Sequence, residues 1–161
     1  MDNLCKMIKL TSAAAHCDIP CKIYDPSIFL VAGLSVARLI DLIKEEQGKD
    51  TSISQTQLIR LVMEKEVQAK IVKDTVNTIW GDYFKEPQLK KFPQIHVLVH
   101  LIMQSASKCK QESTTQNANV LIDHLNQFAE IFWASKEIKT ERVKAPYPPA
   151  LEVVSPMLSS D

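Results

Sequence analysis

Helical periodicity constrains this chain most, because apolar residues recur at helical spacing almost throughout and glycine occurs only three times. Leu121, Leu125, Phe128 and Phe132 illustrate the pattern, since steps of three or four place them on one face of a helix. We expect an all-α protein. Four such segments with short connections favour an antiparallel four-helix bundle.

The ends of the predicted helices follow from capping residues and prolines. Asp25 is a candidate N-cap and Pro26 a first helical residue. The predicted segments, in order, are a helix from about Ser27 to Glu46, a helix opened by Ser54 and reaching Tyr83, a loop over Lys85–Phe92, a helix opened by Pro93, a polar connection over Lys110–Asn117, and a fourth helix. Residues 144–161 hold several prolines, so we expect an unstructured tail there.

Composition excludes several classes of function. At 161 residues the chain is one domain by size, and its 19 basic residues balance 19 acidic ones. That balance gives no basic surface typical of nucleic-acid binding. No apolar run approaches the roughly 20 residues that cross a membrane. The chain also lacks the Glu-x-x-His motif of di-iron bundles.

The residues from His16 to Pro26 concentrate chemistry that the helices lack. This segment holds one imidazole, the two thiols of Cys17 and Cys21, and a phenol at Tyr24. Ala13–Ala15 precede it, a small-residue tract of the kind that proteases cut. We therefore interpret residues 1–15 as a leader whose removal frees the α-amine of His16. Its apolar residues are interrupted by lysines, which is atypical of a secretory signal.

Cleavage after Ala15 would create a metal chelator. The amine of His16 and the backbone nitrogen of Cys17 supply two nitrogens, and Cys17 and Cys21 supply two thiolates. The His16 imidazole can reach the same metal from above that plane. A square-planar arrangement of nitrogen and sulfur ligands suits Ni(II) or Cu(II), whereas zinc prefers four side-chain ligands in a tetrahedral arrangement. On the ligands alone, copper remains an alternative to nickel.

This segment resembles the amino-terminal hook of the nickel superoxide dismutase family. The family pattern His-Cys-Asp-x-Pro-Cys-x-x-Tyr is complete between His16 and Tyr24. Further stretches that resemble the family follow in the same order, at Trp80–Pro87, Phe92–His96 and Ile131–Trp133 with Lys136. The resemblance therefore extends from residue 16 to about residue 136.

The resemblance implies an activity and a set of site residues. The activity is the conversion of superoxide to oxygen and hydrogen peroxide by Ni(II)/Ni(III) cycling, with one nickel ion per subunit. The metal ligands would be His16, Cys17 and Cys21. Tyr24 and Tyr83 would line the approach to the metal. It also implies a homohexamer with the hook at one end of each bundle.

Two further residues are expected to assist. Asp18 is placed to fix the hook, because an aspartate accepts backbone N–H groups in tight turns. Lys85 can add positive potential near the entrance, although a solvated loop lysine is an equally ordinary interpretation. Core packing is the ordinary alternative for the two tyrosines. We also expect a maturation protease as partner and a cytoplasmic location.

Three positions depart from the family pattern. Lys22 stands where the family usually has glycine after the second cysteine. Ala32 stands where some members carry an acid that supports the imidazole, and Gln68 is the counterpart of a second-helix arginine. These changes affect groups around the ligands, which can matter about 10–100-fold at metal sites.

Other classes of function use some of the same residues. A nickel or copper carrier could use the hook without catalysis. A thiol redox sensor would need Cys17 and Cys21 but not His16, and a partner-binding helical protein would need none of the three. Cys109 lies alone in a helical pattern, where a free cysteine is most often a small buried hydrophobe.

Overall fold

The computed structural model describes residues 21–47, 49 and 52–158. This part of the chain is mostly helical and ends in a small antiparallel sheet. Its elements are α1 (Ser27–Gln47), α2 (Ser52–Thr78), the π-helical turn η1 (Ile79–Tyr83), α3 (Glu86–Lys91), α4 (Ile95–Gln111), α5 (Thr115–Ser135), β1 (Thr140–Lys144) and β2 (Glu152–Pro156).

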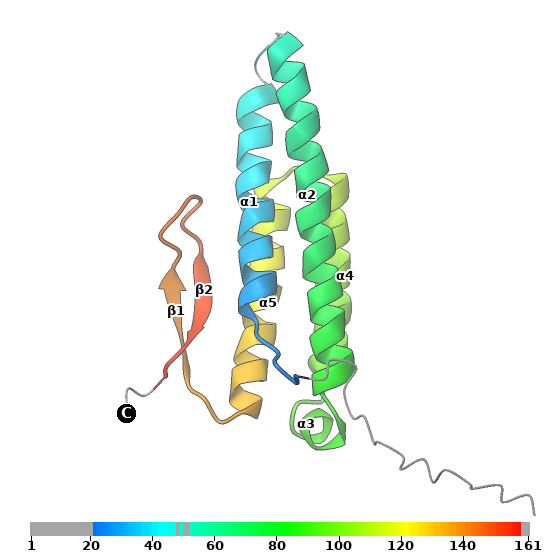
Figure 1. Ribbon diagram of the computed structural model, residues 1–161, viewed down its shortest axis with the longest axis vertical. Helices are drawn as coiled ribbons and strands as arrows, with labels where there is room; N and C mark the ends of the chain where they lie inside the picture. Colours follow the sequence, from blue (N-terminus) through cyan, green and yellow to red (C-terminus); the bar gives the residue numbers. More distant parts are fainter. Residues whose placement is uncertain (1–20, 48, 50–51, 159–161) are drawn as a thin grey trace, which may run out of the picture.

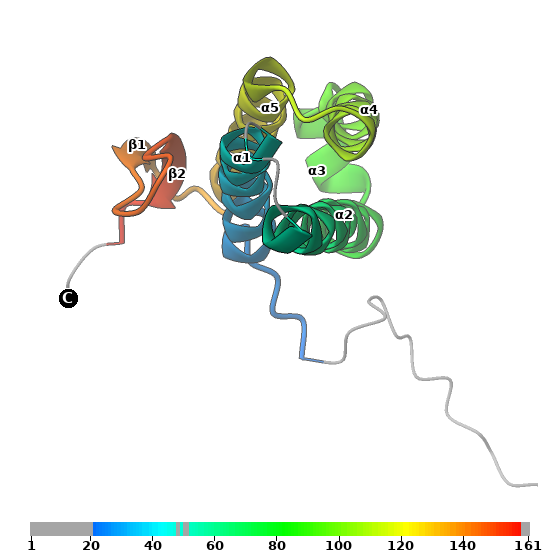
Figure 2. The same ribbon diagram turned by 90° about the horizontal axis from the view of Figure 1, so that it is seen from above.

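The four long helices surround a common core. α1 packs against α2 and α5, and α4 packs against the same two helices. Seen from above, the four lie around one centre, and successive long helices run in opposite directions (Figures 1 and 2). The largest fully buried side chains come from all four: Phe29, Val36, Ile40, Ile43, Val72, Val76, Ile95, Ile102, Leu121, Leu125, Phe128 and Phe132. No helix in the described ranges is long and apolar enough to cross a membrane.

α1 and α5 approach each other closely at Gly33. A Cβ atom at this position would lie 2.5 Å from Cδ1 of Leu125 and 3.1 Å from Cδ1 of Ile122. Both contacts are shorter than normal packing allows, so a side chain here would push the two helices or their side chains apart. Glycine thus permits the contact that holds α1 beside α5.

The first helix begins where capping predicts. Asp25 accepts a hydrogen bond from the Ser27 backbone N–H at 2.7 Å, and α1 starts at Ser27. The polar connection between α4 and α5 is shorter than the predicted Lys110–Asn117, because α4 runs to Gln111 and α5 begins at Thr115. Thr114 caps α5 by accepting a hydrogen bond from the Asn117 N–H at 3.2 Å.

The prediction of a loop over Lys85–Phe92 is wrong, because the helix α3 occupies most of this segment. Pro87 lies in the first turn of α3, where a missing N–H removes no helical hydrogen bond. The Gln88 side chain accepts from the Lys85 backbone N–H at 3.2 Å and caps the start. α4 then begins at Ile95, two residues beyond the Pro93 start that we predict.

The expectation of an all-α chain with an unstructured tail is also wrong. β1 and β2 pair antiparallel with Arg142 opposite Val154 and Val143 opposite Val153. The prolines do not prevent pairing, because Pro146, Pro148 and Pro149 lie between the strands and a fourth ends β2. The tail is therefore a β-hairpin over most of its length.

α5 anchors this hairpin through a buried amide. Asn126 is 2% exposed; its Nδ2 donates to the Glu152 carbonyl at 2.8 Å and its Oδ1 accepts from the Val154 N–H at 2.9 Å. Val154 and Ala145 join the main core. In both views the hairpin lies outside the ring of helices, on the side of α1 and α5 (Figures 1 and 2).

Candidate nickel hook and its tyrosine pair

The described chain enters the hook at Cys21. His16, Cys17 and Asp18 lie outside the described residues, and so do residues 1–15, which we expect to be a leader. Cys21 carries a free, exposed thiol. Among the three predicted metal ligands, Cys21 lies within the described residues. Its exposed sulfur is accessible to a metal ion.

Lys22 has an unusual backbone conformation. Its φ is 57°, in the left-handed region that favours glycine, and its side chain is exposed. A non-glycine residue there costs about 1–2 kcal/mol. This explains why the corresponding family position is suited to glycine. The chain turns at Lys22 and leads to Tyr24, which is 8% exposed and belongs to the core.

The structure brings together Tyr24 and Tyr83, the two tyrosines that the family resemblance places on the approach to the metal. The ring centroids of Tyr24 and Tyr83 lie 6.0 Å apart. Tyr24 precedes α1 in the sequence, whereas Tyr83 ends the turn η1 that follows α2. Tyr83 also packs on Phe84 at 5.1 Å and Phe132 at 4.8 Å. Tyr24 lies three residues after Cys21, so this aromatic pair stands at the base of the hook.

The π-helical turn η1 places Tyr83 at that position. The Phe84 N–H donates to the Ile79 carbonyl at 3.4 Å, which closes a wider turn than an α-helix has. Trp80 in the same turn donates through its indole N–H to Nδ1 of His96 at 3.1 Å. Sequence periodicity extends α2 smoothly to Tyr83 and does not reveal this change of pitch.

Sequence reasoning missed Ser135, the last residue of α5. Its hydroxyl lies 2.7 Å from the Tyr83 hydroxyl and donates to the Phe132 carbonyl at 2.6 Å. No motif marks a serine at a helix end as a partner of a distant tyrosine. Its role becomes visible only when α5 is placed beside η1.

Lys136 is the second group that sequence reasoning left without a role. Its Nζ lies 4.8 Å from the Tyr83 ring centroid and 5.2 Å from that of Phe132. This geometry is a cation–π contact, worth about 0.5–1 kcal/mol at an exposed site. The contact brings a positive charge directly beside Tyr83.

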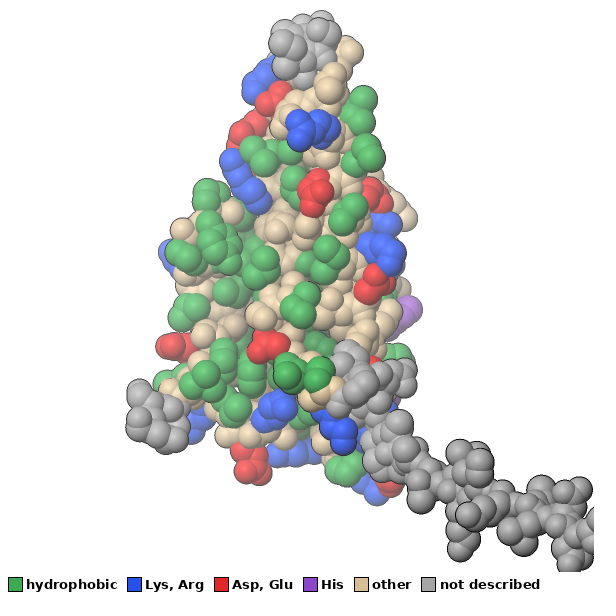
Figure 3. Space-filling view, viewed as in Figure 1, with side chains coloured by type: hydrophobic (Ala, Val, Ile, Leu, Met, Phe, Trp, Pro, Cys, Tyr) green, Lys and Arg blue, Asp and Glu red, His purple; other side chains and the backbone are tan. Residues whose placement is uncertain are grey.

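Lys85 lies near the same end of the molecule and is exposed. Its Nζ donates to the Gly81 carbonyl at 2.9 Å, so it caps η1 rather than standing free. Lys90 and Lys91 in α3 are exposed as well. Figure 3 shows several Lys and Arg side chains, with Asp and Glu side chains among them, at the lower end of the molecule, where Figure 1 places α3.

The hollow beside Tyr24 has a different character. It measures about 240 Å³ and lies between the start of α1 and the end of α2, with Asp25 and Asp74 in its lining. Lys70 pairs with Asp74, which leaves Asp25 as an acidic group at the mouth. A carboxylate here repels an anion, whereas Lys136 and Lys85 place positive charge on the side near Tyr83.

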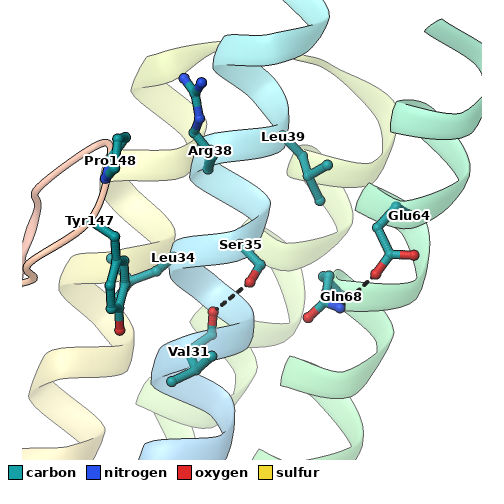
Figure 4. Close-up of a pocket in the computed structure, with 9 residues that line it drawn as sticks. All are labelled: Val31, Leu34, Ser35, Arg38, Leu39, Glu64, Gln68, Tyr147 and Pro148. Atoms are coloured by element: carbon teal, nitrogen blue, oxygen red, sulfur yellow. Dashed lines mark hydrogen bonds between the residues drawn. The ribbon is translucent and has the colours of Figure 1, made fainter. Parts of the chain in front are cut away.

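A larger hollow of about 320 Å³ lies away from these residues (Figure 4). It is lined by residues of α1, α2 and the hairpin turn, and includes Gln68 but none of the predicted site residues in the described ranges. Gln68 donates to Glu64 on its own helix at 2.7 Å. Ala32 is 2% exposed within the core. Neither residue supplies the charged group, an acid at position 32 or an arginine at position 68, that the family resemblance leads us to expect there.

The donor chemistry fits a soft or borderline metal only through the hook. Within the described residues, no three His, Cys, Asp or Glu side chains come together as a metal site. Cys109 is fully buried, and burial raises the pKa of its thiol to about 11. It is therefore inert, as its isolated position predicts, while the exposed Cys21 thiol is available as a ligand.

Comparisons with known proteins agree with the hook pattern. Residues 11–136 match the family described as nickel-containing superoxide dismutase. The superoxide dismutase [Ni] of Streptomyces coelicolor is 32% identical over 78% of this chain and 92% of its own length, and that of Streptomyces seoulensis is 30% identical over 77% and 90%.

A solved structure gives the same result. The native nickel superoxide dismutase structure is 32% identical and has a TM-score of 0.65, covering 76% of this chain and 99% of its own. The family match ends at residue 136, before the hairpin begins at Thr140. The chain belongs to the nickel-containing superoxide dismutase family.

Proposed function

We propose that this chain is a nickel-dependent superoxide dismutase built as an antiparallel four-helix bundle with an N-terminal metal hook. The complete hook pattern from His16 to Tyr24 carries the proposal. The exposed Cys21 thiol and the nearby pair of Tyr24 and Tyr83 support it. A metal carrier would need the hook but not a tyrosine pair that narrows access to it.

The ligands would come from residues 16–21. After removal of residues 1–15, His16 would provide its α-amine and imidazole, Cys17 its backbone nitrogen and thiolate, and Cys21 its thiolate. Bound nickel supplies the one-electron couple that oxidises one superoxide and reduces the next. Thiolates and a deprotonated amide donate the electron density that such a couple needs.

The surrounding residues control access and charge. Tyr24 and Tyr83 form an aromatic wall at the base of the hook and restrict which small molecules reach it. Lys136 and Lys85 give this end a positive potential that attracts the anionic substrate. Asp18 would accept backbone N–H groups and hold the hook in its turn.

The wider proposal includes maturation and assembly. A protease would cut after Ala15 in the cytoplasm, and the processed chains would assemble as a homohexamer. Sedimentation of the nickel-loaded protein tests the assembly. A single species of six chains is expected, and a monomer with full activity would contradict it.

Nickel content and superoxide consumption test the proposed ligands together. The processed wild type should bind about one nickel per chain, following its donor set. Cys21→Ser should abolish both nickel retention and activity, because a hydroxyl is a much poorer donor. Cys109→Ala is the matched control, since it removes a buried thiol away from the hook. Full activity of Cys21→Ser, or of protein loaded only with copper or zinc, would refute the assignment.

A further inference from the structure

The hydroxyl of Tyr83 has a definite partner. It lies 2.7 Å from the Ser135 hydroxyl, and the Ser135 hydroxyl lies 2.6 Å from the Phe132 carbonyl oxygen. These three oxygens form a chain that ends on a backbone group of α5. Both contacts are within the normal range for O–H···O hydrogen bonds.

Counting protons gives the direction of this chain. A carbonyl oxygen only accepts, so the short contact to Phe132 requires the single hydroxyl proton of Ser135. Ser135 then has only lone pairs to offer Tyr83. The contact between the two hydroxyls therefore requires the phenol proton, and Tyr83 is the donor.

We propose that Ser135 is a positioning residue that keeps the phenol proton of Tyr83 turned away from the approach to the metal hook. Toward that approach Tyr83 then presents only oxygen lone pairs. It accepts hydrogen bonds from water but does not donate to small anions. This inference rests on the proposed function in one respect, namely that Tyr83 lines the approach.

Further hydrogen bonds and ring contacts at the end of α5 surround this arrangement. The Ile138 N–H donates to the Trp133 carbonyl at 3.0 Å, and the Glu137 N–H donates to the Ala134 carbonyl at 3.1 Å. Together with the left-handed Glu137, whose φ is 62°, these bonds form a Schellman ending. Phe132 contacts the Tyr83 ring at 4.8 Å, and Lys136 lies over that ring. The Tyr83 ring is therefore fixed as well as its hydroxyl.

A matched pair of substitutions isolates the hydroxyl. Ser135→Thr keeps a hydroxyl, whereas Ser135→Val has the same shape as threonine and lacks it. Ser35→Ala is a further control, because Ser35 makes a similar bond to the Val31 carbonyl in α1 at 2.9 Å. Comparing Val with Thr separates the loss of a hydrogen bond from the effect of a larger side chain.

Raman spectroscopy reads the donor state of Tyr83 without metal or activity. The intensity ratio of the tyrosine Fermi doublet reports whether a phenol donates or accepts, and a difference spectrum against Tyr83→Phe isolates this residue. Wild type and Ser135→Thr should show Tyr83 as a donor, and Ser135→Val should shift the ratio toward that of a hydrated phenol. An acceptor signal in wild type, or no shift in Ser135→Val, would overturn the proposal.

Azide inhibition tests the consequence in the processed, nickel-loaded protein. Ser135→Val frees the phenol proton for an anion, so azide should inhibit about tenfold more tightly, the value of one hydrogen bond to a charged group. Ser135→Thr and Ser35→Ala should match wild type. Equal inhibition of Ser135→Val and Ser135→Thr would overturn the proposal. Absence of activity in the wild type would refute the proposed function instead, and the Raman result would still stand.

Discussion

At the scale of single residues, Lys22 shows two opposing effects at one position. Its left-handed backbone is unfavourable for any residue with a Cβ atom, at a cost of about 1–2 kcal/mol. Its exposed ammonium stands next to Cys21 and adds positive charge beside the predicted metal ligand. An open hook can relax part of the strain, so we expect the charge to dominate the rate.

Lys22→Gly should therefore lower superoxide consumption at low ionic strength and weaken its dependence on salt, with nickel content unchanged. Lys22→Gln is the matched control, because it removes the charge and keeps the Cβ atom. Both variants should show the same lowered rate at low salt and the same weakened salt dependence, because both lack the charge that salt screens in the wild type. An equal or higher rate of Lys22→Gly at every salt concentration would show that the charge has no role.

His124 offers a residue-scale test of stability against pH. Burial lowers the pKa of His124 below its ordinary value, and the neighbouring Asp123 opposes this in part. The folded state then binds a proton less readily than the unfolded state. The stabilisation is complete above the ordinary histidine pKa of about 6.5 and is lost as pH falls below it.

His124→Gln should make the free energy of unfolding less dependent on pH between about 7 and 5. Urea unfolding at a series of pH values measures this dependence. His100→Gln is the control, because His100 is exposed on α4. An unchanged slope in His124→Gln would show that the burial of His124 does not contribute to acid sensitivity.

At the scale of secondary-structure elements, hydrophobic periodicity predicted the long helices because each buries one continuous apolar stripe. The start of α1 followed from local capping by Asp25. Periodicity could not predict the hairpin, whose strands are five residues each and mostly exposed in β1. Its link to α5 is the side chain of Asn126, a tertiary partner that no local pattern identifies. The same limit applies to Ser135 and Tyr83, which meet only through packing.

Asn126→Ala should destabilise the hairpin more than the helices. The substitution leaves the Val154 N–H and the Glu152 carbonyl without their partner, and each unsatisfied buried group costs about 1–3 kcal/mol. We expect a loss of about 2–4 kcal/mol in urea unfolding and faster hydrogen exchange in β2. Asn119→Ala is the control, since Asn119 is exposed on the same helix. Unchanged exchange at Val154 would contradict the anchoring role.

At the scale of the whole molecule, the chain combines a family body with an added element. The family match ends at residue 136, and the hairpin begins at Thr140. The hairpin covers the side of α1 and α5, while Tyr24, Tyr83 and Lys136 gather where α5 ends. The resemblance of the sequence to the family predicted the tyrosine pair. Leader removal and chelation by His16 and Cys17 concern residues outside the described ranges and stay predictions.

The central claim is that removal of residues 1–15 creates the catalytic centre. With Ala15 attached, the His16 nitrogen is an amide and cannot serve as a neutral amine donor. The most direct measurement compares superoxide consumption by intact and processed protein at equal nickel supply, with intact mass determined for the active material. The account predicts activity only in protein that begins at His16 and holds nickel. Full activity in protein that still begins at Met1 would contradict it.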